Sequence, residues 1–313
     1  MLDALGRNIR YLRISVTDRC NLRCRYCMPA EGVEWVDHSA ILTYEQITRL
    51  VGLFAAMGVE KVRLTGGEPL VRKGLHSLVR SIKQVPGIRR VYLTTNGLLL
   101  ADQLPGLLDA GLDGVNLSLD TLDRAQFEAL TRRDELDRAL AGLNAALAAP
   151  GLTVKVNCVP SGENDDQLVP LAALARDWEL AVRFIELMPM GPCAAWPKER
   201  FLPVTEILNR FPALEEIEPN GVARRYRLPG AMGAVGLITP MSHEFCGACR
   251  RIRVTADGKL KGCLHSREEI SLRGLHGREL EDAILRGILH KPKGHHLTEH
   301  ASDTPRTMNE IGG

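Results

Sequence analysis

The sequence predicts an α/β protein whose core is a partial, six-unit (β/α) barrel of the TIM type. Two observations lead to this expectation. Six strand-like segments alternate with helical segments in the first 190 residues, which favours a parallel sheet. On at least five of these strands one face is apolar and the other polar, whereas a parallel sheet covered by helices on both sides would be apolar throughout. We therefore expect helices outside and a wet, partly basic lumen that can hold a charged ligand.

The predicted strands show this division residue by residue, because successive side chains point to opposite faces. Leu12 and Ile14 belong to an apolar row, while Arg13 lies in the polar row of the same strand. An antiparallel sheet with one solvated face would show the same rows, but the helices between the strands disfavour it. The sixth strand is less regular than the others. We expect strands at residues 10–16, 60–65, 90–95, 114–119, 152–159 and 182–187.

Helices are expected between the strands and again near the end of the chain. Thr43 and Gln46 have the spacing of a capping box and predict the start of the first helix. Examples of the helices expected between the strands are 44–57, 75–84, 134–148 and 166–177, and further helices are expected at 204–211 and 278–290. After residue 191 we also expect strands at 221–228 and 234–238, and a hairpin at 251–262 that turns at Asp257-Gly258. The polar segment from Lys291 onward ends in "MNEIGG" and predicts a flexible end.

The bulk composition excludes several classes of protein. A net charge of +2 on 313 residues argues against general binding to nucleic acids or membranes. There is no run of about 18 apolar residues that would predict a membrane span, and the N-terminal segment lacks the apolar stretch of a signal peptide. We expect a cytoplasmic protein whose eight cysteines serve metal or redox chemistry rather than disulfides.

The stretch "RCNLRCRYCMP" places Cys20, Cys24 and Cys27 in a loop directly after the first predicted strand. That position is the C-terminal mouth of a barrel, where the active sites of barrel enzymes lie. Three thiolates can hold one corner of a four-iron cluster and leave one iron open for reaction. A zinc site completed by His38 or by a remote cysteine is the alternative. Three arginines of the loop could offset the negative charge of a cluster: Arg19, Arg23 and Arg25.

The segment "LTGGEPL" at residues 64–70 follows the second strand. Its two glycines would let a ligand approach the backbone closely, and Glu68 would accept a hydrogen bond from an amino group. By itself the segment is an ordinary junction between a strand and a helix. Its position beside the cysteine loop makes it specific.

A second set of three cysteines, Cys246, Cys249 and Cys263, lies around the predicted hairpin. Local spacing fits a cluster and a structural zinc ion equally well, with His243 or His265 as the fourth zinc ligand. Nearby arginines alternate on a strand and suit phosphate oxygens, and the lumen row adds three more cations. Several cations that converge on one cavity lose hydration unless a polyanion balances their charge. A nucleoside triphosphate is the simplest candidate, and the sequence does not specify its base. The cations are Arg251 and Arg253 on the hairpin, and Arg13, Arg63 and Lys155 in the row.

The first cysteine loop, with Tyr26 before its last cysteine, and the Gly-Gly-Glu-Pro segment resemble the radical S-adenosylmethionine (SAM) superfamily. The resemblance implies a [4Fe-4S] cluster on Cys20, Cys24 and Cys27, whose open iron is chelated by SAM. An electron from the cluster would cleave SAM to methionine and a 5′-deoxyadenosyl radical. It also implies a partial radical SAM barrel, residues 1–190, followed by a C-terminal cluster-binding domain, residues 191–313, that closes the barrel.

The two cysteine sets, the opening "GRNIRYLRISVTDRCNLRCRYCMP" and the final Gly312-Gly313 together resemble the family of GTP 3′,8-cyclases of molybdenum cofactor biosynthesis. The resemblance covers the whole chain. It implies a lyase in which the radical takes the C3′ hydrogen of GTP. The C3′ radical would then add to guanine C8, giving 3′,8-cyclo-7,8-dihydro-GTP after reduction. The implied cofactors are SAM and two [4Fe-4S] clusters, the second on Cys246, Cys249 and Cys263 with guanine at its open iron.

The same resemblance implies the roles of individual residues. SAM would contact Tyr26, Gly67, Ser118 and Met188, of which Met188 is alternatively a core residue. GTP would be held by Arg13, Arg63, Thr94, Lys155, Arg251, Ile252 and Arg253. Catalysis would depend on the first three cysteines, on Arg251 and Arg253, and on Gly312 and Gly313, which would enter the active site unless the tail frays. The implied partners are an external electron donor and the next enzyme of the pathway, cyclic pyranopterin synthase. The chain itself is expected to be a monomer or a homodimer.

Other residues receive no role. Cys158 lies in the apolar row and is expected in the core, and Cys193 is expected as an exposed loop thiol. His295 and His296 are expected as surface residues rather than as ligands. Two other functions remain open. One is a peptide-modifying radical SAM enzyme with a groove in place of the phosphate contacts. The other is a zinc-dependent nucleic-acid-binding protein, which the near-zero net charge and the lack of interleaved aromatic residues disfavour.

Overall fold

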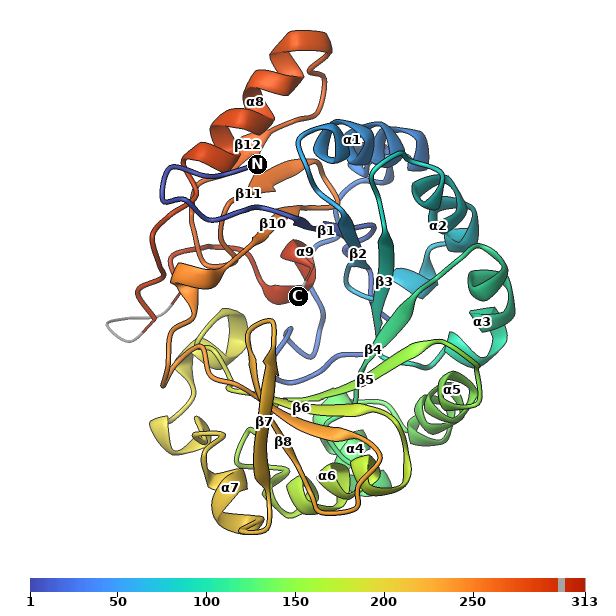
Figure 1. The fold of residues 1–313 in the computed structure, drawn as a ribbon, viewed down its shortest axis with the longest axis vertical. Helices are drawn as coiled ribbons and strands as arrows, with labels where there is room; N and C mark the ends of the chain where they lie inside the picture. Colours follow the sequence, from blue (N-terminus) through green and yellow to red (C-terminus); the bar gives the residue numbers. More distant parts are fainter. Residues whose placement is uncertain (298–301, 313) are drawn as a thin grey trace.

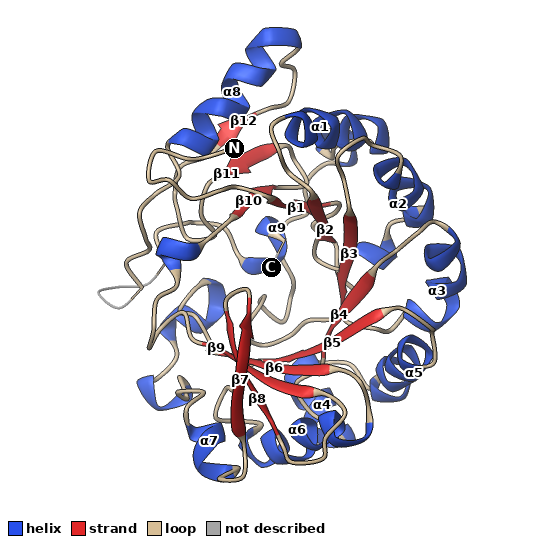
Figure 2. Cartoon of the chain, viewed as in Figure 1, coloured by secondary structure: helices blue, strands red, loops and turns tan. Residues whose placement is uncertain are grey.

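The computed structural model describes residues 1–297 and 302–312 and contains one sheet in the order β12-β11-β10-β1-β2-β3-β4-β5-β6-β9-β8-β7. The strands curve around an interior, and most of the helices lie outside them (Figures 1 and 2). The strands are β1 (Tyr11–Ser15), β2 (Lys61–Thr65), β3 (Arg90–Thr95), β4 (Gly114–Ser118), β5 (Thr153–Cys158), β6 (Ala181–Ile185), β7 (Glu215–Asn220), β8 (Ala223–Arg227), β9 (Ala234–Ile238), β10 (Arg251–Val254), β11 (Lys259–Lys261) and β12 (Ile270–Ser271).

The predicted six-strand parallel arrangement is confirmed, because β1 to β6 pair in chain order and all in parallel. The C-terminal part of the chain extends this sheet at both edges. Strand β9 pairs in parallel with β6, and β10 pairs in parallel with β1. Residues on either side of position 190 therefore share one sheet, and the proposed domain boundary stays a prediction.

The helices are α1 (Tyr44–Ala56), α2 (Leu75–Lys83), α3 (Leu100–Asp109), α4 (Arg124–Thr131), α5 (Leu136–Leu147), α6 (Leu168–Asp177), α7 (Glu206–Arg210), α8 (Gly277–Leu289) and α9 (Met308–Ile311). The predicted capping box begins α1: Gln46 N–H donates to Thr43 Oγ1 at 3.2 Å, and Thr43 N–H donates to Gln46 Oε1 at 2.8 Å. No helix in the described part of the chain is long and apolar enough to cross a membrane.

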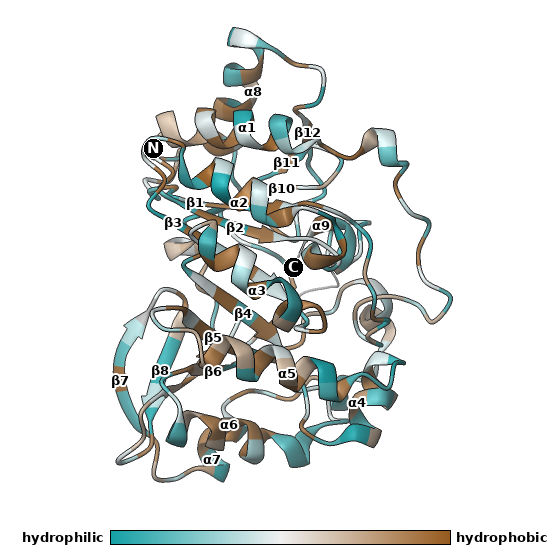
Figure 3. Cartoon of the chain, turned by 90° about the vertical axis from the view of Figure 1, so that its right-hand side faces the viewer, coloured by the Kyte–Doolittle hydropathy of each residue, from teal (hydrophilic) through white to brown (hydrophobic). Residues whose placement is uncertain are grey.

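The two rows of side chains on the strands face different surroundings, as their alternation predicts. Leu12 and Ile14 on β1, like Val62 on β2, have no exposed surface and pack against the outer helices. The opposite row faces the interior, where Arg63 and Asn116 keep about 5% of their surface exposed. The ribbon of β4 is coloured largely as hydrophobic in Figure 3, whereas the ribbons of β7 and β8, at the sheet's edge, are coloured largely as hydrophilic. The core therefore lies between the strands and the outer helices, and the interior is polar.

The C-terminal part differs from the expectation in two places. Strand β7 was not predicted, because "EEIEPN" is charged and contains proline; it pairs with β8 as an edge hairpin. The end of the chain was expected to be flexible, but α9 lies inside the curved sheet (Figure 1) and Ile311 is 1% exposed. Composition alone missed this because the segment is ordered by tertiary contacts rather than by its own propensity.

Candidate active site

The first cysteine loop leaves β1 and folds into a tight turn. The backbone N–H groups of Cys27 and Met28 both donate to the carbonyl of Cys24, at 2.9 and 3.1 Å. Arg132, just after α4, donates from its guanidinium to the carbonyls of Arg23 and Met28 at 2.6 and 3.2 Å. The loop that carries the three thiols is therefore held by hydrogen bonds within its own turn and by Arg132 of the outer helical layer.

The two glycines of the Gly-Gly-Glu-Pro segment make room for the protein's own backbone. A Cβ on Gly67 would lie 2.4 Å from the carbonyl oxygen of Arg19 and 2.5 Å from that of Asp18. The expectation that a ligand alone explains these glycines is therefore incomplete. Glu68 is 1% exposed and accepts hydrogen bonds from Leu70 N–H, Thr95 Oγ1 and Asn96 N–H, at 2.7 to 3.0 Å. Its carboxylate joins the ends of β2 and β3.

Burial keeps the first three thiols protonated in the chain without metal. It raises the pKa of Cys20 to about 11 and that of Cys27 to about 12, and it also raises the pKa of Cys24. Of the three arginines expected to offset cluster charge, Arg23 lowers the pKa of Cys20 through its charge. Arg25 instead pairs with Glu163 at 2.8 Å, and Arg19 is exposed.

Two of the candidate SAM contacts line one pocket beside this loop. Tyr26 and Met188 face it together with Met190, Cys193 and Met308 of α9. The Tyr26 hydroxyl donates to Asp120 Oδ2 at 2.8 Å, and burial raises the pKa of that carboxyl to about 6. The other candidates lie at strand ends. Ser118 closes β4, and Gly67 follows β2.

Cys193 was expected to be exposed, and this expectation is wrong. It is 1% exposed, in a short 3-10 helix (Gly191–Ala195). Its Sγ lies 3.2 Å from the Met188 carbonyl and 3.1 Å from the Met190 carbonyl. Neighbouring loops cover it, which a local reading of "GPCAAWP" could not reveal. Cys158 has no exposed surface, as predicted.

The sheet register aligns the lumen cations across adjacent strands. Arg13 on β1 lies opposite Arg253 of β10 on one side and opposite Arg63 of β2 on the other. The guanidinium of Arg63 donates to Thr94 Oγ1 at 3.3 Å and to the Leu93 carbonyl at 2.9 Å. These contacts gather candidate GTP residues from four strands.

Burial and mutual repulsion lower the pKa values of these cations. Burial lowers the pKa of Arg13 well below its ordinary value, and the charges of Arg253, Arg63 and Arg251 add to the effect. The pKa of Arg253 falls to about 10 and that of Lys155 to about 8, mainly through burial. Cations held this close favour an anionic ligand, because it would relieve both the repulsion and the lost hydration. Ile252 differs from its neighbours, since its side chain is fully buried in the apolar core.

Sequence reasoning missed Arg183 as a member of this group. Its guanidinium donates to Asn157 Oδ1 at 2.6 Å, and its pKa is lowered to about 9 by burial and then by the charge of Arg63. The register of β6 against β5 places Arg183 opposite Asn157, which is in the polar row. Arg183 alternates with the apolar Val182 and Phe184, so this local pattern already indicated that Arg183 faces the lumen, although the predicted strand as a whole looked irregular. Tyr11 and Lys61 lie in the same row, and Lys61 Nζ is 4.8 Å from the Tyr11 ring centre.

The second cysteine set is also brought together. Cys246 begins a 3-10 turn, in which Cys249 N–H donates to the Cys246 carbonyl at 3.1 Å. Burial raises the pKa of Cys246, and the nearby Cys263 and Cys249 raise it further. Burial alone would raise the pKa of Cys249 as well, but Arg251 and Lys291 lower it to about 7. The second set thus adjoins the cationic row through Arg251.

The spacing of the thiols fits clusters better than single zinc ions. Two sulfurs on one tetrahedral zinc ion lie about 3.8 Å apart, since each Zn–S bond is about 2.3 Å. Among residues 1–297 and 302–312, one group of three or more potential ligands has all its ligand atoms within 4.8 Å, namely Glu244, Cys246 and His295. Neither three-cysteine set is that compact, as expected for ligands of separate irons in one cluster.

The C-terminal segment reaches both halves of the site. The Gly312 carbonyl accepts a hydrogen bond from Arg253 Nη1 at 2.8 Å. A Cβ on Gly312 would lie 2.5 Å from Thr65 Oγ1, and its φ of 84° also favours glycine. At the other end of α9, the backbone N–H of Asn309 lowers the pKa of Cys27. Gly313 lies outside the described residues.

Comparison with known proteins agrees with this arrangement. A family model described as the radical SAM superfamily matches residues 14–175, and a model described as Molybdenum Cofactor Synthesis C matches residues 180–297. A GTP 3′,8-cyclase of Alkaliphilus oremlandii is 44% identical over 320 residues, and one of Pelotomaculum thermopropionicum is 46% identical over 326 residues. Each alignment covers 100% of both chains.

Solved structures show the same fold at much lower identity. Streptococcus suis SuiB bound to precursor peptide SuiA has a TM-score of 0.56 at 16% identity, covering 91% of this chain and 66% of that one. The enzyme anSMEcpe with bound AdoMet has a TM-score of 0.55 at 12% identity, covering 96% and 89%. The chain therefore belongs to the radical SAM superfamily and, within it, to the family of GTP 3′,8-cyclases.

Proposed function

We propose that this chain converts GTP to 3′,8-cyclo-7,8-dihydro-GTP as the first step of molybdenum cofactor biosynthesis. One observation carries the proposal beyond family membership: aligned arginines from β10, β1 and β2 lie between two sets of three thiols. A triphosphate is a ligand that such a row needs, and a site between two clusters suits a substrate handled by both.

Cys20, Cys24 and Cys27 are proposed to hold the first [4Fe-4S] cluster, and Tyr26, Gly67, Ser118 and Met188 to surround SAM. When bound, the cluster and SAM would supply a 5′-deoxyadenosyl radical to take the C3′ hydrogen of GTP. C3′ would then bond to guanine C8, and one further electron from the external donor with one proton would complete the dihydro product. The pocket that Tyr26 and Met188 line next to the cysteine loop supports the placement of SAM.

GTP is proposed to lie along the lumen row. Its phosphates would be bound by guanidinium groups, whose forked donors match phosphate oxygens. Lys155 would gain its full charge on binding, since an anion restores a pKa that burial has lowered to about 8. The second cluster, on Cys246, Cys249 and Cys263, would hold the guanine end. The proposed phosphate and ribose contacts are Arg13, Arg63, Thr94, Lys155, Arg183, Arg251 and Arg253.

The C-terminal segment is proposed to position the residues that bind the substrate and to take no part in the chemistry. Gly312 orients Arg253 through its carbonyl, which accepts from Nη1 at 2.8 Å. Only a residue without a side chain fits beside Thr65 and Ser15 at this point. The role expected for Gly313, which lies outside the described residues, stays a prediction.

The reaction needs partners that a single chain does not supply. We propose an external one-electron donor for the first cluster and, as the next enzyme, cyclic pyranopterin synthase, in the cytoplasm. The chain is proposed to act as a monomer or homodimer, without nucleic acid or membrane.

The test is anaerobic reconstitution with iron and sulfide, followed by addition of SAM, GTP and dithionite. Mass spectrometry would detect 5′-deoxyadenosine together with a cyclised, reduced product that is an isomer of GTP. Neither should form with ATP. If SAM is cleaved but GTP gives no product, the chain is a radical SAM enzyme for another substrate. Zinc without acid-labile sulfide in the purified protein would contradict the cluster assignment altogether.

A further inference from the structure

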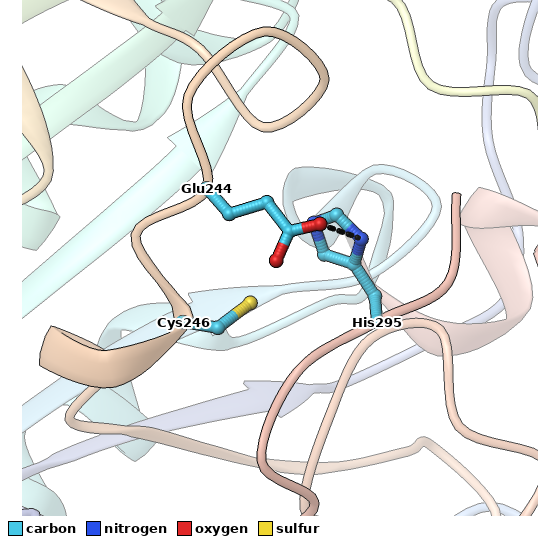
Figure 4. Close-up of side chains that lie close together, drawn as sticks. All are labelled: Glu244, Cys246 and His295. Carbon is cyan, nitrogen blue, oxygen red and sulfur yellow. Dashed lines mark ion pairs between the residues drawn. The ribbon is translucent and has the colours of Figure 1, made fainter. Parts of the chain in front are cut away.

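Beside the second cysteine set lies a group of three side chains with different ligand chemistry. Glu244, Cys246 and His295 have their ligand atoms within 4.8 Å of one another. Figure 4 shows the Glu244 carboxylate and the His295 ring facing each other, with the Cys246 sulfur directed toward them. Thiolate, imidazole and carboxylate are the three ligand types that bind zinc in proteins. The group therefore has the composition of a metal site.

The distances also suit a metal ion better than a direct contact. Glu244 Oε1 and His295 Nδ1 are 3.7 Å apart, which is too long for a hydrogen bond. Two ligands of one tetrahedral ion lie about 3.3 Å apart when each bond is about 2.0 Å. A shift of a few tenths of an ångström would bring them to this spacing. One carboxylate and one thiolate would balance the charge of a divalent ion.

The protein holds the two chain segments of this group together before any metal binds. Arg7 is 6% exposed and pairs with Asp3 at 2.6 Å. Its guanidinium donates to the carbonyl of Cys246 at 3.1 Å and to carbonyls of the segment before His295: Lys291, Pro292 and Lys293, at 2.9 to 3.3 Å. The cysteine and the histidine are therefore positioned by one buried side chain from the N-terminal part of the chain.

The imidazole itself is also held in place. The His295 side chain is 6% exposed, although the sequence placed this residue on the surface, and its ring packs edge-on against His265 at 5.4 Å. His265 Nδ1 in turn lies 2.9 Å from Ser302 Oγ. His296, the next residue, is exposed and serves as a natural comparison. A ring with this support can act as a ligand without a large loss of side-chain entropy.

We propose that, in the absence of the second cluster, Glu244, Cys246 and His295 bind a borderline-soft divalent cation such as Zn²⁺. The site uses one cysteine rather than three. Because it shares Cys246 with the proposed second cluster, the ion and that cluster exclude each other. Metal binding is independent of the proposed function, whereas the exclusion rests on it, and the two are measured separately.

The binding test uses the full chain purified without iron or sulfide and titrated with Co²⁺, which takes zinc sites and reports its ligands spectroscopically. The thiolate-to-cobalt absorption should have the intensity of one thiolate, and one equivalent of Zn²⁺ should abolish it. His295→Ala and Glu244→Ala should each weaken Co²⁺ binding more than about tenfold, since even outer-shell changes cost 10–100-fold. His296→Ala, Cys249→Ser and Cys263→Ser should leave it within about twofold.

The opposite pattern would overturn the proposal. If Cys249→Ser and Cys263→Ser abolish binding while His295→Ala does not, the ion occupies the three cysteines instead. Absence of a thiolate-to-cobalt band in the unaltered chain would also contradict it. Circular dichroism checks the fold of each variant, and His295→Asn and Glu244→Gln replace any alanine variant that does not fold; they should weaken binding in the same direction.

The exclusion test measures iron in chains reconstituted with iron and sulfide in the presence of excess Zn²⁺. The unaltered chain should retain about four irons, one cluster's content, whereas His295→Ala should reach about eight. About eight irons together with one zinc in the unaltered chain would show that Cys246 is not shared. Fewer than four irons per chain in both the unaltered chain and His295→Ala, with or without Zn²⁺, would contradict the cluster assignment of the proposed function. The cobalt result would not be affected.

Discussion

At the scale of single residues, the most informative position is Gly67. The motif that contains it predicts close approach of a ligand, but the atoms closest to a Cβ there are backbone carbonyl oxygens of Asp18 and Arg19. Since these residues lead into the first cysteine loop, the glycine lets the β2 junction pack directly beneath that loop. The motif therefore acts first by positioning its own chain.

Gly67→Ala should destabilise the chain and move the cysteine loop. The added methyl group meets fixed backbone, and overpacking of this kind costs about 1–3 kcal/mol. Urea unfolding of the cluster-free chain measures the loss, and iron content after reconstitution reports the first cluster. The control is Gly52→Ala in α1, where nothing lies within 4 Å and alanine should stabilise the helix by about 0.5–1 kcal/mol. Equal stabilities for both variants would contradict this account.

Cys249 should be the most readily alkylated cluster thiol at neutral pH in the cluster-free chain. Against the effect of burial, Arg251 and Lys291 hold its pKa at about 7, whereas burial raises that of Cys20 to about 11. The thiolate is the reactive form, so the rate should fall about tenfold per unit as pH drops below 7. Peptide mapping after iodoacetamide treatment gives the rate, and Arg251→Ala should move the midpoint to higher pH. A midpoint near that of an ordinary cysteine would exclude the effect.

At the scale of elements, the C-terminal segment depends on a group of charges rather than on its own helix. Arg306, just before α9, pairs with Asp257 at 2.9 Å and with Glu269 at 2.8 Å. Lys261, fully buried on β11, pairs with Glu269 at 3.1 Å and donates to Thr304 at 3.3 Å. A helix of four residues is too short to be stable alone. These pairs therefore hold α9 against the hairpin of β10 and β11.

Arg306→Ala should release the segment that carries α9. Removing Arg306 leaves the Asp257 carboxylate without its ion pair and Glu269 with Lys261 alone, so local opening should become at least about tenfold more frequent. Carboxypeptidase digestion followed by intact mass measures this release. Arg124→Ala is the matched control, because its pairs with Asp134 and Asp137 are exposed. If both variants lose C-terminal residues at the wild-type rate, the ion pairs do not anchor the tail.

At the scale of the whole molecule, charge distribution matters more than net charge. The chain carries a net charge of only +2, yet cations from β1, β2, β5, β6 and β10 face one interior. Burial lowers their pKa values first, repulsion between neighbouring cations lowers them further, and Tyr11 offsets part of the effect for Arg13 and Arg253. The interior is therefore suited to bind a polyanion, which the net charge of the whole chain does not indicate.

GTP should raise the thermal unfolding midpoint of the cluster-free chain, more strongly at low ionic strength, while guanosine should have a much smaller effect. Arg253→Ala should weaken GTP binding about tenfold or more, because a hydrogen bond to a charged group contributes about 1.5–3 kcal/mol. Arg224→Ala on β8, whose pair with Glu216 is exposed, should bind as the unaltered chain does. Unchanged GTP affinity in Arg253→Ala would place the phosphates elsewhere.

Much of the site was predictable because its signals are local. The spacing of Cys20, Cys24 and Cys27 and the alternation of Arg13 and Arg63 with apolar neighbours are visible in the sequence. Cys193 and His295 were placed wrongly on the surface, because burial of a loop residue depends on segments remote in sequence. Arg183 was left out because the predicted strand looked irregular, although Arg183 alternates with Val182 and Phe184; the alignment of β6 with β5 then places it in the polar row.

Local sequence patterns were enough to predict the six parallel strands, the polar lumen and the two sets of three cysteines, because periodicity and spacing arise within short segments. The tertiary structure decided that β9 and β10 extend the sheet at both edges, that Arg253, Arg13 and Arg63 form one row, and that α9 lies inside. It also brought His295 to Cys246 through Arg7. These features join residues that are remote in sequence, and such contacts depend on chain packing that no local pattern encodes.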